Sequence, residues 1–195
     1  MSNIPLPRIN PDGSYGFIGG MMVDADGSPR AYGPPGTKPL DFLANAGHPG
    51  NWWAVVTDNG KPSGNPILQG RMDPCPGYYI SPTTYQHRGF RNDDPLAYVD
   101  SERVIYIVVP SHWRKLAKGV VLGCKATVRR ISDGKQTNAV VADLGPRSKA
   151  GEASIACCEF FGVPSSPKSG GTSNPSFAYT FFPGIAAPGY ELKPM

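Results

Sequence analysis

The sequence predicts a mainly β protein with loop-rich additions and one or two short helices. Short apolar runs separated by turn residues recur along the 195 residues, and the 24 glycines and 22 prolines punctuate these runs without forming a low-complexity tract. Clear helical periodicity occurs over 153–161, where apolar residues recur at a spacing of three. Because strands and helices do not alternate, a parallel α/β sheet is not expected.

The individual strands are predicted from apolar runs bounded by glycine, proline, asparagine or aspartate. They are expected at 17–23, 52–56, 67–68, 104–109, 120–131, 139–142 and 177–182. The turn at 132–135 should return the chain as a hairpin, so that the runs on its two sides pair. A short helix is expected at 40–44, and the main helix follows the strand at 139–142.

Length and charge limit the classes of protein that the chain can belong to. One domain is expected over 1–195, with 1–20 and 184–195 peripheral, and the chain is long enough to bury a sizeable core. The formal net charge is +4, but no basic stripe interleaved with aromatic residues is present, so nucleic acid is not an expected partner. No apolar run reaches 18 residues, so membrane insertion is not expected either. We expect a monomer.

Two carboxylates flank the turn between the strand at 139–142 and the main helix. Asp143 comes directly after the apolar run, and Gly145 and Pro146 then turn the chain. Glu152 comes where the helical pattern begins, so it is expected in the first helical turn. Taken alone, Asp143 reads as a turn residue and Glu152 as a complement to the helix dipole.

A resemblance gives these two carboxylates a chemical role. The segment ADLGPRSKAGEASIA resembles the signature of the glycoside hydrolase family 75 chitosanases, with weaker matches at 23–27, 76–83 and 98–110. The resemblance implies that Asp143 and Glu152 are the catalytic pair, that the cut is endo-acting and that the anomeric centre is inverted. The late order of elements is similar to a double-psi β-barrel, which implies a six-stranded barrel.

Inverting hydrolysis needs one carboxyl as general acid and a second as general base, about 6.5–9.5 Å apart. The family expectation makes Glu152 the acid and Asp143 the base. A helix N-terminus would instead favour the ionised form of Glu152, and burial at a strand end would raise the pKa of Asp143. Both assignments stay open.

A chitosan substrate would need further carboxylates for its ammonium groups and further side chains for its sugar rings. The substrate-binding candidates are Asp24, Asp26, Asp41, Trp52, Gln69 and Tyr79. Asp24 and Asp26 also read as a tight turn. An EF-hand is excluded there, because Pro35 stands where that loop needs glutamate.

No metal and no cofactor is expected. His48, His87 and His112 are isolated, and the four cysteines contain no C-x-x-C pair. Cys157 and Cys158 are predicted to be small buried side chains, whereas a Cys75–Cys124 disulfide stays open.

Two alternative functions are kept. The basic net charge favours an anionic wall polymer, so one alternative is a muramidase-like toxin or lysis enzyme that cuts peptidoglycan. The other is a non-catalytic carbohydrate-binding barrel with Asp143 as a turn residue. Residues 1–7 lack the basic and apolar regions of a signal peptide. We therefore expect an extracellular protein, or one delivered to the cell envelope by a route without a cleaved signal peptide.

Overall fold

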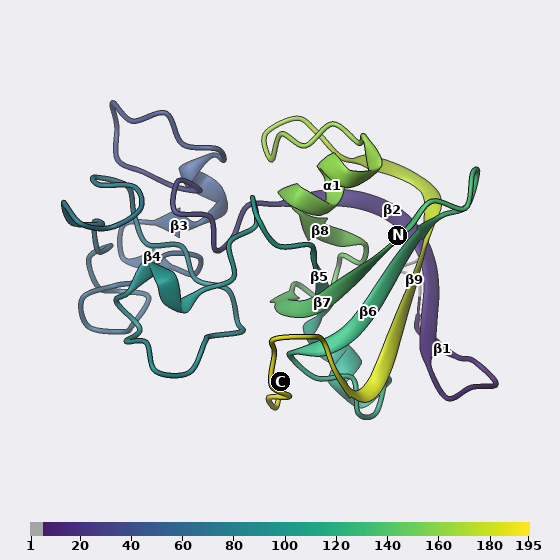
Figure 1. Cartoon of the computed structure of the whole chain (residues 1–195). Helices are drawn as coiled ribbons and strands as arrows, with labels where there is room; N and C mark the ends of the chain where they lie inside the picture. The colour runs from purple at the N-terminus through teal and green to yellow at the C-terminus, as the bar shows by residue number, and fades with distance from the viewer. Residues whose placement is uncertain (1–5) are drawn as a thin grey trace.

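The computed structural model describes residues 6–195, and its centre is a closed six-stranded β-barrel (Figure 1). The strands run in the order β2–β8–β5–β7–β6–β9, and β9 pairs back onto β2. Their bounds are β2 (Tyr15–Asp24), β5 (Tyr106–Pro110), β6 (Cys124–Arg130), β7 (Gln136–Gly145), β8 (Glu152–Ser154) and β9 (Thr172–Ala186). The predicted fold class, a mainly β barrel with loop-rich additions and few short helices, is confirmed.

The barrel is mixed in strand direction. β2 pairs with β8, and β5 pairs with β7, in parallel, whereas the other pairings of the ring are antiparallel. The predicted hairpin is present as β6 and β7, joined across 131–135. Closure of the ring pairs each of these six strands with two others, and β1 (Arg8–Ile9) adds to β2 outside the ring.

The barrel is filled by apolar side chains that alternate with outward-facing ones along the strands. Phe17 stacks on Tyr179 with ring centroids 4.6 Å apart, and the edge of Trp113 meets the Phe17 ring at 5.0 Å. β5 is buried along its whole length, which explains its continuous apolar sequence. The expectation that 1–20 is peripheral is therefore wrong for 15–20, because β2 is a barrel strand and Phe17 lies in the core.

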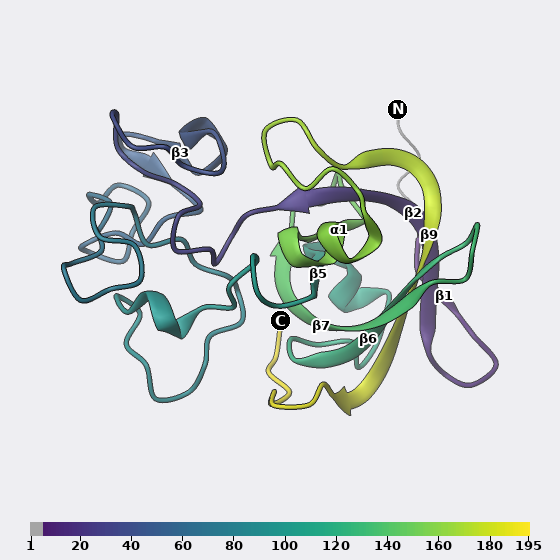
Figure 2. The same cartoon turned by 45° about the horizontal axis from the view of Figure 1, so that its top comes forward.

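The main helix, α1 (Ile155–Phe161), starts later than predicted. Ser154 is its N-cap and accepts a hydrogen bond from the main-chain N–H of Cys157 at 3.2 Å. Gly162 ends the helix in the left-handed region at φ 69°. Figure 2 shows α1 lying over the ring of strands, and Cys157 and Phe161 join the barrel core. Across 6–195, no helix is both long and apolar enough to cross a membrane.

A loop-rich lobe, residues 25–105, lies beside the barrel (Figures 1 and 2). Its short elements are η1 (Leu43–Asn45), β3 (Gly47–His48), β4 (Asn51–Trp52) and η2 (Pro95–Ala97), and η3 (Ser111–Lys115) follows β5. The strand expected at 52–56 is limited to β4, and the one expected at 67–68 is a single bridge between Leu68 and Tyr79. The lobe has its own small clusters around Trp52 and Ile80.

All four cysteines are free thiols in the structure. Cys157 and Cys158 are buried, as predicted, and Cys124 is buried too, whereas Cys75 is half-buried in the lobe. The Cys75–Cys124 disulfide that the sequence left open does not form.

Candidate active site

A cavity of about 770 Å³ opens where the loop-rich lobe meets the ends of the barrel strands. We call it the central cavity. The barrel lines it with Asp24, Val108, Asp143, Gly145 and Glu152, and the lobe lines it with Tyr32, Asp41, Asn45, Trp53 and Thr84. At the end of a strand, the backbone hydrogen bonds to the neighbouring strands hold a residue in place, while its side chain stays accessible to a ligand. Such a position suits a reactive group.

Asp143 and Glu152 reach this cavity from the two neighbours of β5. Val108 of β5 is the cross-strand partner of Asp143 on β7 and of Glu152 on β8. Residues opposite one another across strands point to the same face. Since adjacent strands lie about 4.8 Å apart, the Cα atoms of the two carboxylates are separated by roughly 10 Å.

A β-bulge places Asp143 in this row. Ile107 pairs with Val141, but Val108 pairs with Asp143, so Ala142 is an extra residue in β7. Without that extra residue, Ala142 would stand opposite Val108 and Asp143 would point to the other face of the sheet. The bulge therefore aims the carboxylate into the central cavity.

Asp143 is buried and held by its neighbours. Its Oδ1 accepts hydrogen bonds from the main-chain N–H groups of Thr84 and Leu144, each at 2.8 Å, and from the Thr84 hydroxyl. Burial raises the pKa of Asp143 to about 6, against the opposing effect of the Thr84 and Leu144 hydrogen bonds. A carboxyl in this range can exchange a proton near neutral pH.

Glu152 lies at the start of β8 and not in the first turn of a helix, so the sequence-based placement is wrong. The helix-dipole argument about its ionisation therefore does not apply. Its charged neighbour is Lys149, whose Nζ lies 3.3 Å from Glu152 Oε1. Gly145 leaves room for the other oxygen, since a Cβ at Gly145 would lie 2.8 Å from Glu152 Oε2.

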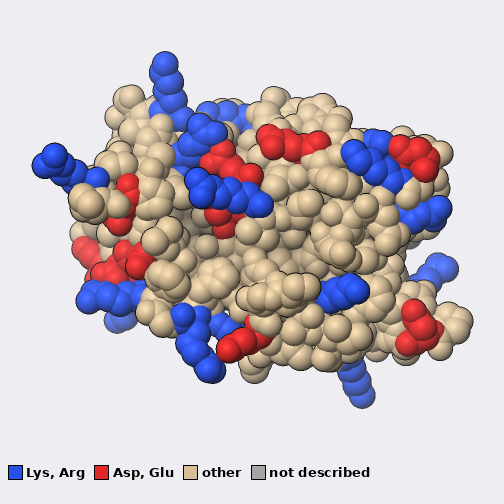
Figure 3. Space-filling model, in the orientation of Figure 1, with Lys and Arg blue, Asp and Glu red and all other residues tan. Residues whose placement is uncertain are grey.

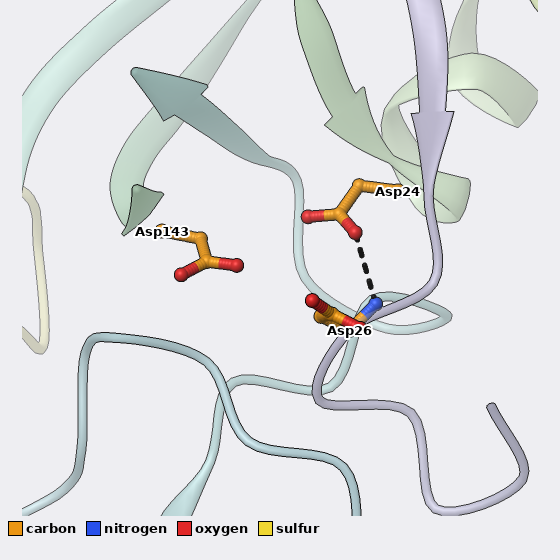
Figure 4. A group of neighbouring side chains, drawn as sticks. All are labelled: Asp24, Asp26 and Asp143. Atoms are coloured by element: carbon orange, nitrogen blue, oxygen red, sulfur yellow. Dashed lines mark hydrogen bonds between the residues drawn. The ribbon is translucent and has the colours of Figure 1, made fainter. Parts of the chain in front are cut away.

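Asp24 and Asp26 complete a group of carboxylates around Asp143 (Figure 4). One oxygen from each of the three lies within 4.8 Å of the others. Burial raises the pKa of Asp24 to about 8, and the neighbouring Asp143 charge adds to the rise. Burial, then the Asp24 charge, holds the pKa of Asp26 well above its ordinary value.

Each of the three carboxylates accepts a hydrogen bond from a protein donor. Asp26 accepts from the Tyr32 hydroxyl at 2.9 Å, Asp24 accepts from the main-chain N–H of Asp26 at 3.1 Å, and Thr84 binds Asp143. Carboxylate groups of this kind bind divalent cations in some proteins, but here we assign no ion to them. That the protein needs neither metal nor cofactor stays a prediction.

The predicted substrate-binding residues divide into two sets. Asp24, Asp26 and Asp41 all line the central cavity, and the Asp41 carboxylate is held by the Asn45 amide at 2.9 Å. Trp52 does not line the cavity, because it is buried among the lobe's apolar residues and packs against Tyr79. The cavity is lined instead by Trp53, which is 58% exposed and whose indole N–H donates to the main-chain oxygen of Asn45 at 2.7 Å.

Gln69 and Tyr79 are structural residues and not cavity residues. Gln69 is buried; its side chain donates to the main-chain oxygens of Pro29 and Tyr79 and accepts from the Cys75 N–H, so it ties lobe loops together. Tyr79 packs against the cluster around Trp52. Neither lines the cavity.

Sequence reasoning missed Thr84, Lys149 and Tyr106. Thr84 directly follows the 76–83 match, and Lys149 lies inside the 142–156 segment, so both stand near matched residues. The sequence alone does not show that Thr84 bonds to Asp143 or that Lys149 pairs with Glu152. Tyr106 stands in an apolar strand, where core packing is the default reading.

The cavity is acidic although the protein is basic. Five carboxylic residues line it, and Lys149 is the one lysine or arginine among the lining residues. Figure 3 shows lysine and arginine scattered over one face of the molecule without a continuous stripe. The net charge of +4 therefore does not describe the site.

The chain matches no protein-family model and no curated protein sequence.

Proposed function

We propose that the protein is an endo-acting glycoside hydrolase that cuts β-1,4 bonds of chitosan with inversion, using Asp143 and Glu152. The observation that carries the proposal is their placement on either side of Val108, on one wall of one cavity. The resemblance of the 142–156 segment to the family 75 chitosanases supports the same pair.

The separation of the two strands favours inversion. Asp143 and Glu152 stand two strands apart, with Cα atoms roughly 10 Å from each other, and inversion requires that their carboxyl groups hold a water molecule between the acid and the base. Inverting enzymes hold their carboxyls about 6.5–9.5 Å apart for this reason. Asp24 and Asp143, with oxygens within 4.8 Å, are too close to form such a pair.

The surroundings of the two carboxylates support one assignment of their roles. Asp143 is the general acid, because burial raises its pKa to about 6 and keeps a proton available near neutral pH. Glu152 is the general base, because the Lys149 ammonium beside it compensates a negative charge there. The acid protonates the leaving glycosidic oxygen, the base takes a proton from water, and that water bonds to the anomeric carbon.

The charge of the cavity favours an amino-sugar polymer. Chitosan is a polycation, and Asp41 lines the same cavity in addition to the reacting pair. Trp53 offers an exposed ring, fixed by its bond to Asn45, on which the apolar face of a pyranose can stack. A polymeric substrate of this kind also places the proposed action outside the cell or at the cell envelope.

One assay distinguishes the chitosanase proposal from the two alternatives, a muramidase-like enzyme and a non-catalytic carbohydrate-binding barrel. Release of reducing ends from chitosan, peptidoglycan and cellulose is measured side by side, with solution viscosity as the readout of internal cuts. We expect cleavage of chitosan with an early fall in viscosity. Cleavage of peptidoglycan alone would establish the muramidase alternative, and binding without any cleavage would establish the carbohydrate-binding alternative.

A further inference from the structure

We infer that the general acid is a pair of carboxyls, Asp24 and Asp143, that share one proton, with Asp24 acting through Asp143 as a positioning residue. This inference rests on the proposed function, because it concerns the proton that the hydrolysis consumes. It goes beyond that function by giving Asp24 a task other than contact with substrate ammonium groups.

The geometry brings the two carboxyls together from separate strands. Asp24 is the last residue of β2 and Asp143 lies in the bulged part of β7, and Figure 4 shows their carboxyl groups turned toward each other. Their oxygens lie within 4.8 Å, Asp143 is 7% exposed, and Asp24 is half-buried. Two like charges so close and so little hydrated do not both ionise near neutral pH.

Tyr106 holds the Asp24 carboxyl in place beside Asp143. Its hydroxyl lies 2.8 Å from the main-chain oxygen of Asp26 and 3.0 Å from Asp24 Oδ2. A hydroxyl has one hydrogen, and a carbonyl oxygen can only accept it. The Tyr106 hydroxyl donates toward these two oxygens, and its bond to Asp24 lowers the pKa of that carboxyl against the larger effects of burial and of the Asp143 charge. Asp24 Oδ1, in turn, accepts from the Asp26 N–H.

Asp143 can receive and release the shared proton at its other oxygen. Its Oδ1 accepts three hydrogen bonds, from Thr84 twice and from Leu144. Over residues 6–195 no protein hydrogen bond reaches Asp143 Oδ2, which leaves that oxygen for the Asp24 proton or for substrate. The proton passes from the pair to the glycosidic oxygen, and solvent returns one proton after the product leaves.

Several other titratable or charged groups face the pair, and they do not replace it. They are Asp26 and Tyr32 from the lobe, Tyr106 from β5, Lys149 and Glu152 before and in β8, and Cys158 from α1. Burial raises the pKa of both tyrosines and raises that of Cys158 to about 12, so these three stay neutral near pH 7. Burial, then the Asp24 charge, raises the pKa of Asp26 well above its ordinary value.

The pKa values agree with a shared proton. Burial and the Asp143 charge raise the pKa of Asp24 to about 8, whereas the pKa of Asp143 is raised to about 6. In a coupled pair these values belong to two steps of the pair. Between pH 6 and 8 the pair therefore holds one proton, and above pH 8 it holds none.

The first test is the pH profile of kcat/KM on a chitosan oligomer. In wild type, kcat/KM should fall on the basic side with an apparent pKa of about 8. In Asp24→Asn, the apparent pKa of this basic limb should be about 6, which is a shift of about two pH units. Asp93→Asn, which removes one exposed carboxylate paired with Arg91, is the matched control and should not shift the profile. An unshifted basic limb in Asp24→Asn would overturn the inference.

A second variant guards against misfolding of Asp24→Asn. Tyr106→Phe keeps the ring and removes the hydroxyl that donates to Asp24 Oδ2, so the pKa of Asp24 should rise and the basic limb should move to higher pH while thermal unfolding stays cooperative. An unmoved basic limb would mean that the titration of Asp24 does not set it, and would contradict the shared proton.

A readout without substrate separates this inference from the proposed function. Carboxyl ¹³C NMR should show the Asp143 resonance titrating in two steps, near pH 6 and pH 8 in wild type, and in one step in Asp24→Asn. One step in wild type, with chitosan still cleaved, would overturn the shared proton alone. Two steps in a protein that cleaves no polysaccharide would overturn the proposed function, and the acid role with it.

Discussion

Asp143 and Glu152 have the same cross-strand neighbour, Val108, although they lie on different strands and are joined by a loop that passes the end of β5. Their separation is thus set by the spacing of three adjacent strands and not by the conformation of the loop 146–151. The barrel strands can therefore hold the two carboxylates at a fixed separation even if the loop 146–151 changes conformation.

Replacement of either carboxylate by its amide should remove most hydrolysis. Asp143→Asn and Glu152→Gln are near-isosteric, and an acid or base role typically contributes about 10²–10⁴-fold to the rate. We expect at least a hundredfold fall in kcat, measured by reducing-end release, with a melting temperature close to wild type. A variant that keeps a tenth of the wild-type rate would exclude that residue as acid or base.

Gly145→Ala should impair catalysis without adding a functional group. The new Cβ would lie 2.8 Å from Glu152 Oε2 and 2.9 Å from a Val108 methyl group, so the carboxylate must move. A displacement near 1 Å costs on the order of 10²-fold in rate, and we expect kcat to fall with little change in KM. Gly70→Ala is the matched control, because its Cβ would meet only an ordinary contact at 3.6 Å. Equal kinetics of the two variants would show that Glu152 is not so closely confined.

Loss of Trp53 should affect substrate binding, whereas loss of the adjacent Trp52 should affect stability. Trp53→Ala should raise KM on the order of tenfold, the factor that 1.4 kcal/mol of binding free energy produces, and should leave stability intact because this side chain is exposed. Trp52→Ala should lower the free energy of unfolding by about 3–5 kcal/mol, since it empties a buried site. Steady-state kinetics and denaturant titration measure the two effects, and the reverse pattern would assign the stacking surface to Trp52.

The raised carboxyl pKa values predict how stability depends on pH. Asp24 has a pKa of about 8 in the folded protein against an ordinary value of 3.8, so the folded state keeps a proton that the unfolded chain releases. The stabilisation is complete below pH 3.8 and is lost as the pH rises through 8. The melting temperature should therefore fall between pH 6 and 8, and this slope should be shallower in Asp24→Asn than in Asp93→Asn. Equal slopes would mean that Asp24 is ionised in the folded protein.

Asp143 was placed correctly at the end of a buried strand from the sequence, because an apolar run followed by Asp-Leu-Gly-Pro is typical of a strand that ends in a turn. Glu152 was assigned to the wrong element. Only three residues of β8 precede the helix, which is too few to show a period of two. Their strand character comes from pairing with β2 and β5, which are distant in sequence.

The remaining errors have similar causes. The bulge at Ala142 leaves no mark in the sequence, yet it decides which face Asp143 takes. Trp52 and Trp53 are adjacent, and the choice between them depends on which face of a two-residue strand meets the lobe's small core. The clustering of Asp24 with Asp143 depends on barrel closure, which no local pattern encodes.

The most direct test of the account is the anomeric form of the first product. Wild-type protein is added to a β-1,4 glucosamine oligomer, and the anomeric protons are followed by NMR before mutarotation equilibrates them. We expect the α-anomer to appear first, because the proposed mechanism inverts the anomeric centre with Asp143 and Glu152, which stand two strands apart. Initial formation of the β-anomer, or no product at all, would contradict it.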